Sequence, residues 1–241
     1  MDPRPAAAER MLSGVKRILC VGSGKGGVGK SIVTSLTALL MKKRGIGVGL
    51  LDLDLHGPSL STILGEDRLT VREERGLLPQ KVAGIPLMSI LPFVENNPSF
   101  LRGQDVSNAV LELLSVTRWG SLDFLLVDMP PGGGDEIMDI ARFIKRAKFL
   151  LVSTPSKVTL PTMERMARAL MVLGVKIAGI VENMNSEKYS PSKHLAERLG
   201  VRFLGALPFD AELEGAIGKP EKLLRTAAAA ELEKIIGRLA K

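Results

Sequence analysis

Short apolar runs alternate with helical stretches along most of the sequence. The runs are continuous rather than alternating, a pattern typical of parallel strands that are buried on both faces. They cover residues 17–21, 48–51, 124–127, 149–152, 177–181 and 202–206. The helical stretches cover residues 32–43, 107–116, 136–145, 160–173 and 191–199. This order predicts an α/β fold, a doubly wound and mostly parallel sheet with helices on both faces.

Three segments depart from this alternation. Residues 77–91 hold two apolar stretches around Ala83-Gly84, which predicts a β-hairpin or an edge extension of the sheet. Residues 220–241 form an amphipathic pattern that predicts one helix, either docked on the domain or lying on a membrane surface. Residues 1–14 have no apolar core, so we expect a mobile tail that is not a secretory signal. Residues 15–241 are then expected to form a single domain.

Composition narrows the class of protein. Hydrophobic residues make up 45% and charged residues 24% of the 241 residues, as in ordinary globular proteins, and no apolar run reaches a membrane-spanning length. We therefore expect a cytoplasmic protein without stable membrane insertion. The net charge of +7 permits anionic partners, but one Trp and one Tyr make no stacking platform, so no nucleic acid is expected. The single cysteine, Cys20, excludes an internal disulfide and is predicted to be buried.

A glycine-rich stretch between the first predicted strand and helix carries the strongest chemical signal. Residues 24–31 fit the phosphate-loop pattern G-x-x-x-x-G-K-[ST], in which converging backbone N–H groups and a helix N-terminus hold phosphates. Lys30 would reach the β- and γ-phosphates, and the Ser31 hydroxyl would bind Mg²⁺. The candidate nucleotide-binding residues are Gly24, Lys25, Gly26, Gly27, Val28, Gly29, Lys30, Ser31 and Ile32. An ordinary glycine-rich turn is the alternative, which the flanking strand and helix disfavour.

Acidic residues follow two other predicted strands. Asp128 ends four apolar residues, the pattern of a Walker B strand whose carboxylate serves Mg²⁺, and the Pro-Pro-Gly at 130–132 leads into a loop. Asp52 and Asp54 are two residues apart and would point the same way in an extended chain. One could hold metal-bound water while the other orients the attacking water. Turn carboxylates at strand ends are the alternative for Asp52 and Asp128.

These motifs together resemble the MinD/ParA/Mrp group of ATPases. Residues 24–31 are similar to its deviant Walker A motif, with Lys25 at the signature lysine. The Asp-Leu-Asp-Leu-His-Gly-Pro-Ser at 52–59 resembles switch I of the Mrp branch. Residues 118–132 and the Val-Glu-Asn-Met at 181–184 are also similar to that branch. The resemblance runs from about residue 16 to residue 220.

The resemblance implies a slow Mg²⁺-dependent ATPase that forms a homodimer on ATP binding. It implies that Lys25 acts on the partner's ATP and that Asp54 positions the attacking water. It places Ser31, Asp52 and Asp128 around Mg²⁺. Asn183 would recognise adenine, although an Asn that caps a turn is the alternative. The loop that closes on the base would be Pro208, Phe209 and Asp210.

One departure from the Mrp pattern concerns the cargo. Mrp-type iron–sulfur carriers have a Cys-x-x-Cys after the Glu-Asn-Met segment, but residues 185–192 contain no cysteine. The chain therefore lacks the thiolates for a bridging cluster. Three functions remain: an ATPase that assists a maturation protein or client apoprotein in iron–sulfur assembly, a nickel metallochaperone in hydrogenase maturation, or a MinD-like positioning ATPase. The two metallocentre functions are favoured, and a purely structural nucleotide module would leave Lys25 and Asp54 without a role.

Overall fold

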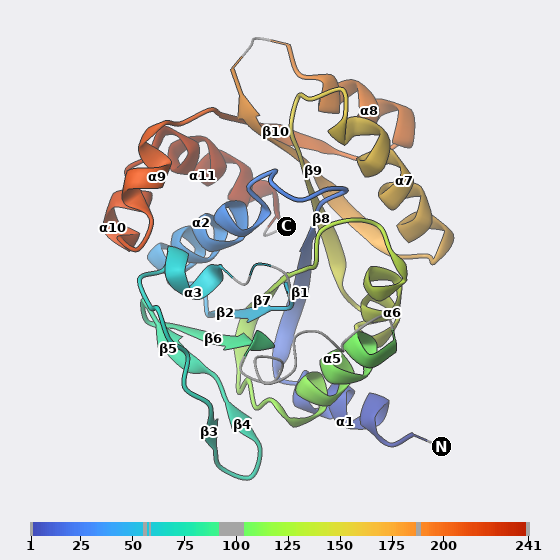
Figure 1. Cartoon of the computed structure of the whole chain (residues 1–241), viewed down its shortest axis with the longest axis vertical. Coiled ribbons are helices and arrows are strands. Elements are labelled where there is room, and N and C mark those ends of the chain that lie inside the picture. Colours follow the sequence, from blue (N-terminus) through green and yellow to red (C-terminus); the bar gives the residue numbers. More distant parts are fainter. Residues whose placement is uncertain (1, 55–56, 58, 92–103, 187–188, 240–241) are drawn as a thin grey trace.

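An eight-stranded sheet forms the centre of the computed structural model, which describes residues 2–54, 57, 59–91, 104–186 and 189–239 (Figure 1). The strand order is β10-β9-β8-β1-β7-β2-β6-β5, and only the β5–β6 pair is antiparallel. The strands are β1 (Val15–Gly22), β2 (Val48–Asp52), β5 (Gln80–Val82), β6 (Ile85–Ser89), β7 (Leu122–Asp128), β8 (Lys148–Ser153), β9 (Lys176–Asn185) and β10 (Phe203–Pro208). The predicted doubly wound, mostly parallel fold is confirmed.

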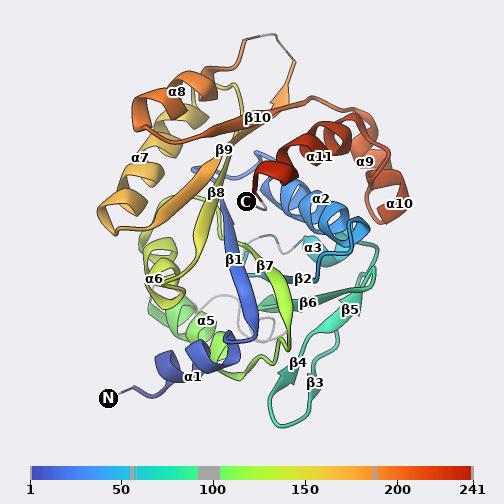
Figure 2. The ribbon, with the colours of Figure 1, turned by 180° about the vertical axis from the view of Figure 1, so that it is seen from behind.

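Helices cover both faces of the sheet, and each face has its own apolar core (Figures 1 and 2). One face carries α1 (Arg4–Met11), α5 (Gln104–Val116), α6 (Asp135–Phe143), α7 (Thr159–Val172) and α8 (Pro191–Leu199). The other carries α2 (Lys30–Lys43), α3 (Leu60–Ile63), α9 (Glu212–Ala216), α10 (Pro220–Leu223) and α11 (Ala227–Leu239). The central strands are buried from both sides, which explains their continuous apolar runs.

The register of the central strands sets the position of the acidic residues. Val21 of β1 and Asp52 of β2 both lie opposite Asp128 of β7. The carboxyl ends of these three strands therefore meet at one edge of the sheet. This is the edge at which open α/β sheets bind ligands.

The predicted mobile tail at residues 1–14 is wrong over most of its length. Residues Arg4–Met11 form helix α1, which packs along α5. Ala8 and Leu12 stand one helical turn apart, so they share a face, and both are buried in the core beside α5. The alanine-rich sequence is a good helix former, and the apolar surface of α5 supplies the packing partner.

The C-terminal segment forms two helices instead of the one predicted. A new helix begins at Ala227 because the Thr226 hydroxyl accepts a hydrogen bond from the Ala229 N–H (3.2 Å), the arrangement of an N-cap. The apolar face of α11 is buried against α2 and β10, with Leu232 and Ile236 inaccessible to solvent. The docked alternative is therefore the one that the structure shows.

The hairpin predicted around Ala83-Gly84 is present as β5 and β6. It also extends the sheet, because β6 pairs in parallel with β2. A second, two-stranded sheet, β3 (Arg72–Glu73) with β4 (Leu77–Leu78), projects from the same end of the molecule (Figure 1). In the described part of the chain, no helix is both long and apolar enough to cross a membrane.

Candidate nucleotide-binding site

The phosphate loop leaves the end of β1 and enters α2 at Lys30. Gly29 has φ = 79°, and a Cβ at this position would lie 2.2 Å from Asn183 Nδ2. Only glycine fits a left-handed backbone at such a close approach. No side chain among the described residues caps the first turn of α2, so its N–H groups remain available to an anion.

Lys30 is the buried cation at the carboxyl edge of the sheet. Its Nζ lies 2.7 Å from Asp128 Oδ2 and 3.4 Å from Asp54 Oδ2. Ser31 Oγ donates a hydrogen bond of 2.6 Å to the same Asp128 oxygen. The structure thus brings together four of the residues that the sequence singles out, Lys30, Ser31, Asp54 and Asp128.

Thr34 is a further member of this cluster that the sequence motifs did not single out. Its hydroxyl lies 2.8 Å from the other oxygen of Asp128, Oδ1, and is fully buried. Thr34 follows Lys30 by one helical turn on α2, so the two residues share a face. That spacing is the signal that could have identified it. Both oxygens of Asp128 are therefore held by α2.

Asp52 organises the chain that follows β2. Its Oδ1 accepts from the Asp54 N–H (3.1 Å), and its Oδ2 accepts from the Leu60 N–H (3.3 Å). Burial, and then the negative charge of Asp128, raise the pKa of Asp52 to about 7. Leu55, His56 and Pro58, which belong to the predicted switch I segment, lie outside the described residues.

The donor set fits a Mg²⁺ ion that is shared with a nucleotide. Ser31, Asp52 and Asp128 offer oxygen ligands, and the like charges of the two buried carboxylates favour a cation between them. No group of three or more His, Cys, Asp or Glu within the described ranges is arranged to hold a metal by itself. Mg²⁺ usually takes one or two carboxylates and completes its shell with phosphates and water.

Two adjoining cavities have the layout of a nucleotide site. A cavity of about 430 Å³ is lined by the phosphate loop, Asp54 and Pro131. A second cavity, of about 260 Å³, is lined by Asn183, Pro208, Phe209 and Asp210, as the predicted base site requires. Both include Gly29, Ile32 and Ile217 in their walls. A bound molecule can therefore extend from the phosphate loop into the second cavity.

The predicted base-site residues differ in what their side chains do. Asn183 Nδ2 donates to the Val28 carbonyl (2.9 Å), which links β9 to the phosphate loop. Phe209 lines the cavity and is 65% exposed, so its ring is accessible to a ligand. The carboxylate of Asp210 accepts from the N–H groups of Glu212 (3.0 Å) and Ala228 (3.2 Å). Asp210 thus orders α9 and α11 around the cavity.

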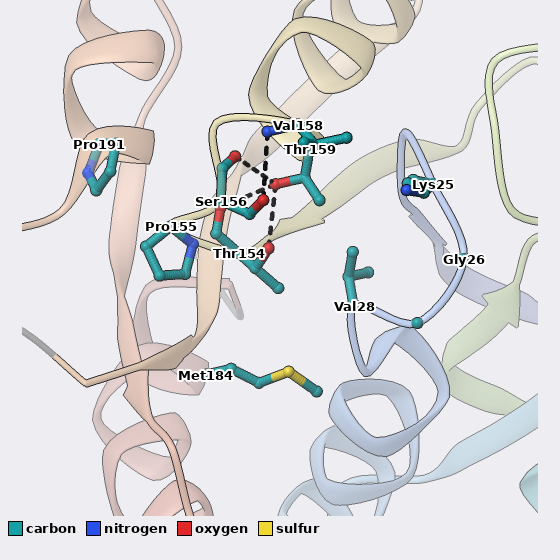
Figure 3. A pocket seen from close by; sticks show the side chains of 11 residues that line it. Lys25, Gly26, Val28, Thr154, Pro155, Ser156, Val158, Thr159, Met184 and Pro191 are labelled. Carbon is teal, nitrogen blue, oxygen red and sulfur yellow. Dashed lines mark hydrogen bonds between the residues drawn. The ribbon is translucent and has the colours of Figure 1, made fainter.

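Lys25 faces a different cavity from Lys30. A volume of about 480 Å³ lies between the phosphate loop and the loop after β8, and Lys25, Thr154, Val158 and Met184 are among its lining residues (Figure 3). The Lys25 side chain is exposed and makes no hydrogen bond or ion pair with any described residue. It does not line the phosphate cavity of its own chain. Its ammonium is therefore available to an anion outside this site.

Cys20 lies in the middle of β1, where it contributes only to packing. Its side chain is inaccessible to solvent, as the sequence predicts, and burial raises the pKa of its thiol above the usual range. A buried, protonated thiol is a poor nucleophile and a poor metal ligand. The sequence contains no other cysteine.

The sheet order, the phosphate loop and the acidic residues at the strand ends define a P-loop NTPase. A family model described as "ParA: NUBPL iron-transfer P-loop NTPase" matches residues 14–241. The chain belongs to this family, and the predicted resemblance to the Mrp branch of the MinD/ParA/Mrp group is confirmed.

Relatives and solved structures agree with this placement. An iron-sulfur cluster carrier protein of Aquifex aeolicus is 33% identical over 255 residues, which cover 99% of this chain and 70% of the relative. An iron-sulfur cluster carrier protein of Methanococcus maripaludis is 34% identical, and the match covers 98% of this chain and 88% of the relative. A nucleotide-binding protein of Archaeoglobus fulgidus in complex with ADP is 29% identical with a TM-score of 0.73, covering 95% and 92%. The cell division ATPase MinD of Pyrococcus furiosus shares the fold with a TM-score of 0.68 and 22% identity. This match covers 92% of this chain and 98% of the MinD chain.

Proposed function

We propose that this protein is a Mg²⁺-dependent ATPase that acts as an ATP-switched dimer in the assembly of iron–sulfur metallocentres. The observation that carries the ATPase is the buried cluster of Lys30, Ser31, Asp54 and Asp128 beside an open phosphate loop. The names of the relatives, iron-sulfur cluster carrier proteins, support the metallocentre role.

Binding of Mg²⁺-ATP would change the partners of Lys30. Its ammonium now balances Asp128 and Asp54, and it would move to the β- and γ-phosphate oxygens. Ser31, Asp52 and Asp128 would then hold the Mg²⁺, which supplies the positive charge that Lys30 withdraws. Asp54 would be released to orient water for attack on the γ-phosphate. The same residues would thus balance charge with and without a bound nucleotide.

Dimerisation would complete the site through Lys25. The exposed Lys25 side chain lines another cavity than the phosphate cavity of its own chain, so a second copy facing the loop would present its γ-phosphate within reach. A two-fold interface forms this contact twice. Each lysine would stabilise transition-state charge on the partner's nucleotide, as an arginine finger does.

The cargo would be held by another protein. Cys20 is buried and is the only cysteine, so this chain would not bridge a cluster with its own thiolates. We propose that a maturation protein or client apoprotein in the cytoplasm supplies the cluster ligands, and that the nucleotide state controls its binding. A membrane-positioning role is disfavoured because α11 buries its apolar face on the domain.

Titration calorimetry and a phosphate-release assay test the ATPase. Lys30→Ala should lose Mg²⁺-ATP binding, whereas Asp54→Ala should bind ATP and not hydrolyse it. Asp123→Ala is the matched control, because Asp123 lies at the amino end of the same strand as Asp128 and pairs with Lys16 (2.7 Å). Asp123→Ala should bind and hydrolyse as the wild type does. Unchanged ATP affinity in Lys30→Ala, or full turnover in Asp54→Ala, would reject the assignment.

A further inference from the structure

The end of β9 contains a buried carboxylate that the proposed ATPase mechanism does not use. Glu182 is inaccessible to solvent and accepts three hydrogen bonds from the segment that follows it. Its Oε1 accepts from Asn185 Nδ2 (2.5 Å) and Ser190 Oγ (2.7 Å), and its Oε2 accepts from the Ser192 N–H (2.8 Å). Hydrogen bonds to a buried carboxylate are strong, so Glu182 holds Asn185, Ser190 and Ser192 in place around it.

The bond between Glu182 and Asn185 closes a turn around two residues of the nucleotide site. It joins side chains three positions apart, and Asn183 and Met184 lie between them. Met184 has φ = 58°, a left-handed conformation that a non-glycine residue adopts only where its surroundings enforce it. The Glu182–Asn185 bond is a constraint of this kind.

The third hydrogen bond ties the same turn to α8. The Ser192 N–H belongs to the first turn of that helix, where backbone donors have no partner within the helix. A carboxylate at this end is also favoured by the helix dipole. Glu182 therefore connects the end of β9 to the first turn of α8.

Both residues inside the turn contact the nucleotide site. Asn183 Nδ2 is bonded to Val28 and lies as close to Gly29 as a glycine backbone permits. Met184 lines the base cavity and also the cavity beside Lys25, where its side chain extends toward Val28 (Figure 3). A small displacement of the turn would therefore move a wall of the base cavity.

We propose that Glu182 is a positioning residue for base recognition, which acts by holding Asn183 and Met184 in place. With Nδ2 bonded to Val28, Asn183 has its Oδ1 left to accept a hydrogen bond, and no described residue donates one. An amide oxygen matches the exocyclic amine of adenine and not the carbonyl of guanine. This inference rests on the proposed function, because it requires that the cavity of Asn183 binds the base of ATP.

Comparison of ATP with inorganic tripolyphosphate separates base recognition from phosphate binding. Titration calorimetry in Mg²⁺ is done on the wild type, Glu182→Ala, Glu182→Gln and Asn185→Ala. Asn185→Ala removes the turn-closing bond together with the bond from Asn185 Nδ2 to the Tyr189 carbonyl (3.1 Å), and it leaves two donors on the Glu182 carboxylate. It is the variant that decides if Glu182→Ala does not fold. Glu197→Gln is the matched control, since Glu197 is an exposed carboxylate on α8 that contacts only His194 (3.5 Å) among the described residues.

We expect Glu182→Ala and Asn185→Ala to lose at least about tenfold in ATP affinity, the effect of one hydrogen bond. Tripolyphosphate affinity should stay within about twofold of the wild type, because the variants change no residue of the phosphate loop and leave Lys30 and the N–H groups of α2 in place. Glu182→Gln, which keeps one acceptor oxygen, should lie between the wild type and Glu182→Ala, and Glu197→Gln should match the wild type.

Three results would overturn the inference. ATP affinity could be unchanged in Glu182→Gln and Asn185→Ala, or ATP and tripolyphosphate affinities could fall together, as a merely structural role would cause. The wild type could also bind the two ligands equally, which would mean that the base is not recognised. A wild type that binds neither ligand would instead reject the proposed function, and the inference with it.

Discussion

Loss of the Lys30 ammonium should destabilise the nucleotide-free protein strongly. In Lys30→Met, the methylene chain still fills its space, but Asp128 and Asp54 lose the cation that lies 2.7 and 3.4 Å from them. Breaking a buried ion pair by removing one partner costs about 3–5 kcal/mol. For a chain of this size, that corresponds to a fall in melting temperature of about 6–20 °C.

The cost should be recovered when the carboxylate is neutralised as well. The assay is urea unfolding at neutral pH, without nucleotide or Mg²⁺, on Lys30→Met, Asp128→Asn and the double variant. The double-mutant cycle should give a coupling free energy of about 1–3 kcal/mol. Lys25→Met is the matched control in the same loop, and because Lys25 is exposed, its free energy of unfolding should change by less than about 0.5 kcal/mol.

Two results would refute this account of Lys30. Lys30→Met could cost less than about 1 kcal/mol, which is the range of an exposed ion pair. The effects of Lys30→Met and Asp128→Asn could also add without coupling, which would mean that the ammonium does not balance this carboxylate.

Two further predictions concern buried ionisable groups. The pKa of Asp52 is about 7 in the folded protein, above its ordinary value of 3.8, so the folded state keeps a proton that the unfolded state loses. The free energy of unfolding should therefore fall as pH rises between about 4 and 7. Urea titrations of Asp52→Asn should show a flatter pH dependence. An identical pH dependence in Asp52→Asn would mean that another group causes the fall. Cys20 should resist iodoacetamide in the native protein and react in urea, and reconstitution with iron and sulfide should give no cluster on this chain. Native alkylation of Cys20, or stoichiometric bound iron and sulfide, would contradict its buried and unreactive state.

The sheet and the phosphate site could be predicted because their signals are local. Continuous apolar runs identify buried parallel strands, and the carboxyl ends of such strands meet at one edge, so Asp52 and Asp128 could be placed beside the phosphate loop from the sequence. The loop itself is a contiguous motif whose glycines and lysine have separate physical roles. These features need no knowledge of distant contacts.

The parts that could not be predicted depend on contacts between segments far apart in the sequence. Helix α1 is stabilised by α5, about a hundred residues away, and residues 1–14 alone gave no sign of that partner. The carboxylate of Asp210, a predicted base-site residue, accepts a hydrogen bond from the N–H of Ala228 at the start of α11, and the sequence does not show this contact. Glu182 lies inside the motif that marked the Mrp resemblance, yet only the structure shows that Ser190 and Ser192 fold back onto it.

The most direct test of the ATP-switched dimer is light scattering on Asp54→Ala, in which bound ATP should persist. In saturating Mg²⁺-ATP this variant should have the mass of a dimer, and without nucleotide it should have the mass of a monomer. Adding Lys25→Ala should return it to a monomer while ATP stays bound, because the exposed Lys25 would contact the partner's nucleotide. A monomeric Asp54→Ala in saturating Mg²⁺-ATP, or a dimer that survives Lys25→Ala, would contradict the account.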